Sequence, residues 1–187
     1  MPLPDSPDRS AHHTRELKCL GFRREDGLWE IEAHLLDTKP YWFPNHEKNG
    51  VDPGQPIHRM SLRLTLDLDF LIHKVDVAMD DTPYGICRQV ENNIRKLEGI
   101  RIGPGWLKKV RERMPRNAGC THLYELLNPI ATTAYQSMHL ALEERADSLP
   151  GRNAPPILDQ CLTLARTSEV VRIRWPAFHE SKESDIG

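Results

Sequence analysis

Alternation of apolar and polar side chains predicts two antiparallel strand pairs in the first half of the chain. A turn signal at 25–27 (Glu-Asp-Gly) separates two alternating segments, residues 14–24 and 28–37. A second pair follows, in which 58–68 and 71–79 are joined by a turn at Asp69–Phe70. A period of two is typical of half-buried strands. One face of this second pair is expected to carry Met60, Leu62, Leu64, Leu66 and Leu68, then Leu71, His73, Val75, Val77 and Met79.

The period changes to that of helices near residue 81. A start signal at 81–83 (Asp-Thr-Pro) precedes a predicted helix that ends before Gly99, with Ile86, Val90, Ile94 and Leu97 on one face. A short helix is expected over 106–114, closed by Pro115. A longer helix opens at 117–122 and has the apolar stripe Leu123, Leu126, Leu127, Ile130, Ala134 and Met138. The segment 170–175 (VVRIRW) predicts a last strand.

Strands that come first and helices that come second favour an α+β fold, with helices packed on one face of an antiparallel sheet. Residues 1–13 are rich in proline, serine and charge, and we expect them to form a disordered tail. Residues 14–176 would then form one α+β domain, and 177–187 a second tail. Residues 38–57 contain four prolines and predict a long irregular loop, a kind of segment that is often functional.

Charge and composition restrict the class of partner. The 187 residues include 25 basic and 27 acidic side chains, so the formal net charge is −2 and there is no basic block of the kind that binds nucleic acid. The apolar runs are too short to span a bilayer, and none resembles a signal peptide. We therefore expect a soluble, cytoplasmic protein whose partner is a small molecule or another protein, and neither nucleic acid nor a membrane.

Cysteine and histidine are the candidate chemistry. The four cysteines are widely spaced, with no CxxC pair, which is typical of reduced thiols in a reducing compartment. Three predicted element starts carry such residues: His58 begins a strand, Cys87 lies near a helix start, and Cys120 and His122 open the long helix. These starts can meet at one edge of the sheet, where the residues would suit zinc or an iron–sulfur cluster. We predict His58, Cys87 and Cys120 as metal ligands. His122 would be either a fourth ligand or a residue that contacts one of the ligands from outside.

Two other interpretations stay open. In a metal-free thiol/His enzyme acting on a small metabolite, Cys87 or Cys120 would be the thiolate and His58 or His122 the base. In an accessory binding protein the same residues would only pack in the interior, as small buried cysteines usually do. The sequence contains no substrate signature, so it names no reaction and leaves open whether the protein is an enzyme.

From about residue 15 to 176 the chain resembles a bacterial domain family whose function is uncharacterised. The resemblance is carried by the segments PGQPIHRMSLRLTLD, DDTPYGICRQVENNIRKLEGIRIGPGW and AGCTHLYELL. The order of ligands, strands and helices also looks like that of NifU-type iron–sulfur scaffold proteins. That likeness implies a NifU-like core with an extra N-terminal hairpin. In it His58 and Cys87 would match the first two cysteines, Met60 the aspartate, and Gly119-Cys120 the final His-Cys. A histidine thus replaces one thiolate, and the aspartate is absent.

Overall fold

The computed structural model describes residues 3–147, 154–155 and 157–181 of the chain. Contacts divide the chain into two compact units, residues 1–141 and 142–187. The expectation of one domain over 14–176 stays a prediction. Among the described residues, no helix combines the length and the apolar character needed to cross a bilayer.

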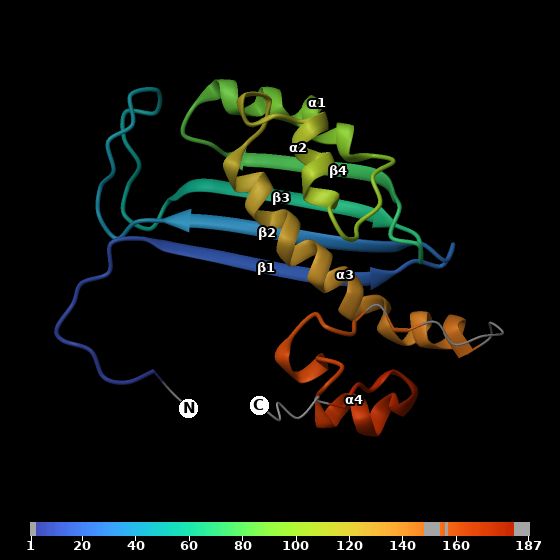
Figure 1. Ribbon diagram of the computed structural model, residues 1–187. Helices are drawn as coiled ribbons and strands as arrows, with labels where there is room; N and C mark the ends of the chain where they lie inside the picture. Colours follow the sequence, from blue (N-terminus) through green and yellow to red (C-terminus); the bar gives the residue numbers. More distant parts are fainter. Residues whose placement is uncertain (1–2, 148–153, 156, 182–187) are drawn as a thin grey trace. The chain divides into compact units, whose positions relative to one another are not determined.

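The first unit is built on a four-stranded antiparallel sheet in the order β1-β2-β3-β4 (Figure 1). The strands are β1 (Thr14–Arg23), β2 (Trp29–Thr38), β3 (Pro56–Leu66) and β4 (Ile72–Asp81). Both predicted strand pairs are therefore confirmed, and β2 also pairs with β3. The predicted loop between β2 and β3 is present and is braced by a backbone bridge between Phe43 and Val51.

Two short turns join the outer strand pairs. Gly27 lies at φ 86° in the β1–β2 turn, a backbone region open to glycine, and its N–H donates to the Arg24 carbonyl. The β3–β4 turn is organised by Asp67, whose Oδ1 accepts from the backbone N–H groups of Asp69 and Leu71. Both turns lie where the sequence predicts them.

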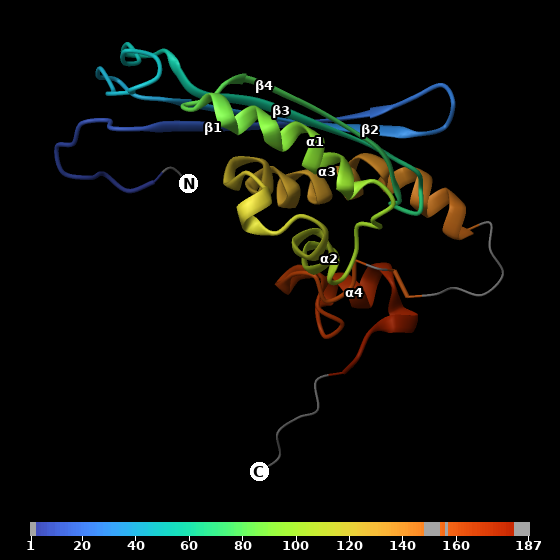
Figure 2. The same ribbon diagram turned by 90° about the horizontal axis from the view of Figure 1, so that it is seen from above.

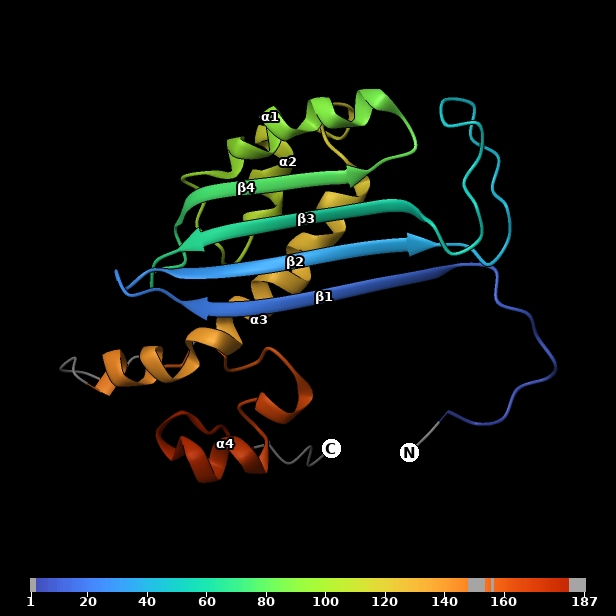
Figure 3. The ribbon, with the colours of Figure 1, turned by 180° about the vertical axis from the view of Figure 1, so that it is seen from behind.

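Helical segments cover one face of the sheet in this unit (Figure 2), whereas no helix of the described residues lies on its other face, the bare face (Figure 3). They are η1 (Gly85–Gln89), α1 (Val90–Ile94), η2 (Arg95–Leu97), α2 (Trp106–Arg113), η3 (Arg116–Ala118) and α3 (Thr121–Asp147), the last of which continues beyond residue 141, where this unit ends. The α+β prediction, with helices on one face, is confirmed. All six residues of the predicted α3 stripe are buried, and they face inward together with the alternate apolar residues of β2 and β3.

Two sequence-based expectations differ from the structure in this unit. The register of β3 against β4 shifts between Thr65 and Leu66, so Ile72 is buried and His73 is exposed, where it binds Asp67. The predicted helix after residue 82 is divided among η1, α1 and η2. This division turns Ile86 away from the buried face and leaves it 67% exposed. Both differences arise from local irregularities that a regular period does not show.

The second unit contains η4 (Leu162–Leu164), α4 (Glu169–Arg174) and η5 (Pro176–Phe178). The strand predicted at 170–175 is wrong, because this segment forms α4. Ser168 caps it by accepting a hydrogen bond from the Val171 N–H, and Arg172 pairs with Glu169 one turn away. The segment 150–156 (PGRNAPP), whose prolines and glycine predict a linker, lies almost entirely outside the described residues.

The close packing of β1 against α3 can be tested by a substitution at Gly21. A Cβ at Gly21 would lie 1.8 Å from the Ser137 Oγ, so the absence of a side chain lets the helix approach the strand. We expect Gly21→Ala to lower the free energy of unfolding by about 1–3 kcal/mol because of overpacking. Denaturant unfolding would measure the change. Gly103→Ala is the matched control, since a Cβ there meets nothing within 4 Å; equal stability of the two variants would contradict this packing.

Candidate functional site

A buried carboxylate lies at the end of β2. The inward row of β2 runs Trp29, Ile31, Ala33, Leu35 and then Asp37, which is only 1% exposed. The register places Arg15 of β1 on one side of Asp37 and His58 of β3 on the other. Because residues at paired positions share a face of the sheet, all three side chains lie on the face that the helices cover.

Arg15 binds this carboxylate through a bidentate pair of hydrogen bonds. Its Nε donates to Oδ1 of Asp37 and its Nη2 to Oδ2, each at 2.7 Å, and its Nη1 pairs with Glu125 of α3. Burial alone would raise the pKa of Asp37, but the hydrogen bonds and positive charge of Arg15 outweigh it and lower the pKa below its usual value. Asp37 is therefore a fixed negative charge at neutral pH.

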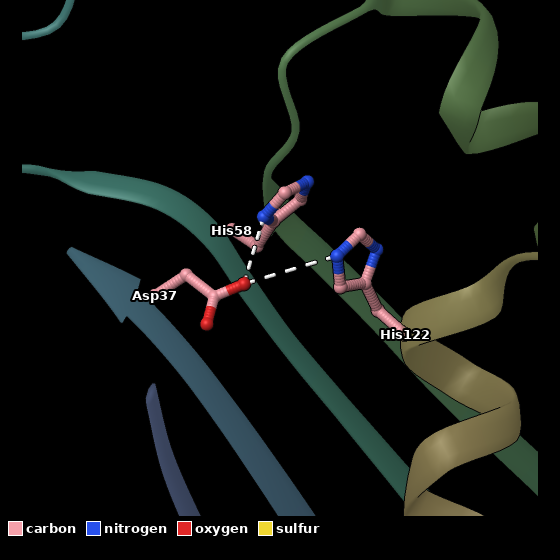
Figure 4. A group of neighbouring side chains, drawn as sticks. All are labelled: Asp37, His58 and His122. Atoms are coloured by element: carbon pink, nitrogen blue, oxygen red, sulfur yellow. Dashed lines mark hydrogen bonds and ion pairs between the residues drawn. The ribbon is translucent and has the colours of Figure 1, made fainter. Parts of the chain in front are cut away.

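Two histidines approach the same carboxylate oxygen (Figure 4). Nδ1 of His58 lies 2.9 Å from Oδ2 of Asp37, and Nε2 of His122 lies 3.8 Å from it. The two imidazole rings overlap, with centroids 3.8 Å apart. His122 comes from the first turn of α3, immediately before the buried Leu123, so the apolar stripe of the helix sets its direction.

Both histidines are held in the neutral form. Burial is the main cause that lowers the pKa of His58, and the neighbouring His122 lowers it further, against the opposing effect of Asp37. Burial also lowers the pKa of His122, followed by the charge of Arg15. A neutral imidazole has one nitrogen with a free lone pair, which can bind a metal ion or accept a proton.

A third histidine reaches the carboxylate from the start of the chain. Nε2 of His13 lies 3.3 Å from Oδ1 of Asp37, on the side away from the oxygen that faces His58. The sequence places His13 in the N-terminal tail, yet its side chain contacts the most buried carboxylate of the site. Asp37 is thus surrounded by one guanidinium and three imidazoles.

The predicted ligands are only partly brought together. His58 and His122 meet, and Sγ of Cys120 lies 3.7 Å from Nδ1 of His122. Cys87 lies in η1, which follows β4, whereas the site is centred on β2. In the described part of the chain, the one group of three ligating side chains close enough for an ion is Asp37, His58 and His122, and it includes no cysteine.

Asp37 is the residue that the sequence prediction missed. The alternation that places Trp29, Ile31 and Ala33 inward continues to Leu35 and then to Asp37. A charged residue on an apolar row is a signal that could have found it. The same continuation on β1 runs from Leu17 back to Arg15, whose side chain shares the inward face.

The bare face of the sheet offers a weaker candidate. A shallow hollow of about 260 Å³ is lined by Glu32, His34, Ser61, Leu62, Arg63, Asp76, Val77 and Ala78. Its charges already satisfy one another, because Arg63 pairs with both Glu32 and Asp76. Exposed ion pairs of this type contribute little and need no ligand. We therefore place the candidate site at Asp37 and not in this hollow.

The fold and the site together define an α+β domain with a candidate metal centre at one end of its sheet. The family described as "Protein of unknown function (DUF2889)" matches residues 13–136, which include every residue of this centre, and the chain belongs to that family. Comparison with curated proteins gave no match, and comparison with solved structures gave none. The likeness to NifU-type scaffolds and the bacterial source stay predictions.

The two hydrogen bonds from Arg15 to Asp37 are expected to contribute strongly to the stability of the fold. Asp37→Asn should lower the free energy of unfolding near neutral pH by about 2–3 kcal/mol, because an amide cannot accept from both arms of Arg15. The folded-state pKa of Asp37 is lowered, so this stabilisation exists above the ordinary aspartate pKa and disappears as the pH falls through the lower value.

Urea unfolding of wild type and Asp37→Asn from pH 7 down to pH 3 measures both effects. The exposed Glu125→Gln variant, which loses the other partner of Arg15, is the control and should change stability by less than about 1 kcal/mol. A difference between wild type and Asp37→Asn that stays constant over this pH range would contradict the assignment.

Proposed function

We propose that this protein binds one divalent transition-metal ion through Asp37, His58 and His122. The observation that supports the proposal is the convergence of one carboxylate and two imidazoles, whose ligand atoms all lie within 4.8 Å of one another. Bonds of about 2.0–2.2 Å to a tetrahedral ion put neighbouring ligand atoms roughly 3.3 Å apart. The separations of Oδ2 from the two histidine nitrogens, 2.9 and 3.8 Å, lie on either side of that value.

The donor set indicates the kind of ion. Two imidazoles and a carboxylate suit Zn²⁺ or Fe²⁺, whereas Mg²⁺ and Ca²⁺ prefer sites made of oxygen. The protonation states suit a cation as well, since Asp37 is ionised and both histidines are neutral. An iron–sulfur cluster would need several thiolates, and the group contains none. We therefore favour a mononuclear ion over a cluster.

Charge around the site is arranged to tolerate an added cation. Asp37 and Glu125 contribute two negative charges and Arg15 one positive charge, so the three side chains sum to −1. An ion would take the place of the hydrogen bond between Nδ1 of His58 and Asp37, and the neutral ring would then carry its one proton on Nε2. Arg15 would then act as an outer partner that fixes the orientation of the ligating carboxylate.

Removal of either histidine should abolish tight binding. In protein purified without a histidine tag, we expect one equivalent of Zn²⁺ or Fe²⁺ by elemental analysis. His58→Ala and His122→Ala should each weaken the affinity at least about 100-fold in a competition titration with a chelator. His34→Ala is the matched control, because His34 lies on the bare face of the sheet, bonded to Ser61.

Cys87→Ser should also retain the ion, since Cys87 lies outside the three-residue group. Wild-type protein with far less than one equivalent of metal, unchanged in the two histidine variants, would overturn the proposal.

A second function, thiol catalysis without a metal, is favoured by one specific contact. Sγ of Cys120 lies 3.7 Å from Nδ1 of His122, and Nε2 of the same ring faces Asp37 at 3.8 Å. Thiol, imidazole and carboxylate in this order form a catalytic triad with a cysteine nucleophile. In such a triad the imidazole takes the thiol proton, and the carboxylate orients the imidazole. Of the thiols predicted for this chemistry, the contact favours Cys120.

Alkylation rates distinguish this second function. If His122 takes the proton of Cys120, iodoacetamide at pH 7 should modify the half-buried Cys120 faster than the exposed Cys161. His122→Ala should then slow the reaction of Cys120 about 10-fold and leave Cys161 unchanged. Residue-resolved mass spectrometry gives both rates. Faster labelling of Cys161, with no effect of His122→Ala on Cys120, would count against thiol catalysis.

A further inference from the structure

We propose that His13 is the fourth ligand of the ion, so that the residue immediately before the sheet closes the site. This inference rests on the proposed function, because it assumes the ion held by Asp37, His58 and His122. Three protein ligands leave one position of a tetrahedral ion to be filled. The question is which donor in the described chain is placed to fill it.

The backbone explains why His13 points at the site. His13 directly precedes β1 and lies two residues before Arg15, so an extended chain puts both side chains on the same face. Nε2 of His13 lies 3.3 Å from Oδ1 of Asp37, whereas His58 and His122 face Oδ2. His13 therefore lies beside the three-residue group, and its ring would turn to reach an ion bound to Oδ2. The side chain is 41% exposed, which leaves it room to rotate toward an ion on the carboxylate.

Cys120 is the competing donor, but it lies on the wrong side of a ligand. Its Sγ contacts Nδ1 of His122, whereas the opposite ring nitrogen, Nε2, faces Asp37. An ion bound to Nε2 therefore has the His122 ring between itself and the thiol. Cys120 is placed to accept a hydrogen bond from the Nδ1–H of His122, at the position where metal-ligating histidines usually have a carboxylate, a carbonyl or water. His13 instead approaches from the carboxylate side.

With His13 the donor set becomes three imidazole nitrogens and one carboxylate oxygen, which suits Zn²⁺. The ligands would come from the start of β1, the end of β2, the start of β3 and the start of α3. An ion there would tie the N-terminal segment to the sheet. His13 is the most exposed of the four side chains, so it is the ligand that a small anionic or neutral molecule would displace most readily.

His12 supplies a matched control. It is the preceding residue, so its side chain points to the other side of an extended chain, and its ring lies 5.5 Å from the ring of Tyr41. His12→Ala and His13→Ala thus remove the same group from adjacent positions, and only the second removes a donor aimed at Asp37.

The test is zinc K-edge X-ray absorption on the untagged full chain loaded with one equivalent of Zn²⁺, together with a chelator competition titration. Wild type and His12→Ala should show three imidazole ligands. His13→Ala should show two and bind Zn²⁺ about 10–100-fold more weakly. Equal imidazole counts and affinities in all three proteins would overturn the role of His13 alone, provided that His58→Ala loses the ion. Failure of wild type to bind Zn²⁺ would overturn the proposed function itself.

Discussion

The buried carboxylate of Asp37 is the constraint on which the arrangement of the site depends. A charge out of contact with water is costly unless it is paired and hydrogen-bonded. Arg15 on the neighbouring strand supplies two hydrogen bonds, and His58 on the other neighbouring strand supplies a third. The cost of burial is therefore offset only when β1, β2 and β3 pair in this register. A shift by one residue would turn these side chains to the bare face.

The helix that carries His122 is held in place by contacts outside the site. The buried stripe of α3 fixes which way the helix faces, and the absence of a side chain at Gly21 lets it lie close to β1. At its start, the hydroxyl of Tyr124 donates to the Met114 carbonyl and so ties α3 to the end of α2. A Cβ on Gly119 would lie 2.5 Å from the Tyr124 ring, so glycine is needed in this connection. Rigid elements thus position the His122 ring over His58.

Much of the fold could be predicted from periodicity, because regular elements bury regular faces. The two hairpins and the α3 stripe follow from periods of two and 3.6. The strand expected at 170–175 is wrong because its apolar residues also suit one turn of helix, and capping by Ser168 decides between the two. His73 and Ile86 were misplaced by a register shift and by 3-10 segments, which depend on tertiary contacts.

Two of the four predicted ligands lie in the group of side chains that the structure brings together. Strand and helix starts indicated His58 and His122, and both residues lie in the group. The cysteines at the same kind of position suggested thiolate ligands, but position along an element does not determine which side of a neighbouring ring a side chain occupies. Asp37 is hard to recognise from sequence because the inward apolar row of its strand ends at Leu35. The pairing of Arg15, Asp37 and His58 across three strands depends on the strand register, which a single sequence does not determine.

Long-range ¹H–¹⁵N spectra of the histidine side chains test the central claim most directly. They would be recorded on the untagged, ¹⁵N-labelled full chain before and after one equivalent of Zn²⁺. We expect neutral rings for His58 and His122 before the ion is added, and ligation shifts at Nδ1 of His58 and Nε2 of His122 afterwards. Resonances of His34 and His73, on the bare face and the β3–β4 hairpin, should not move. Unchanged resonances of His58 and His122 in the presence of the ion would contradict the account.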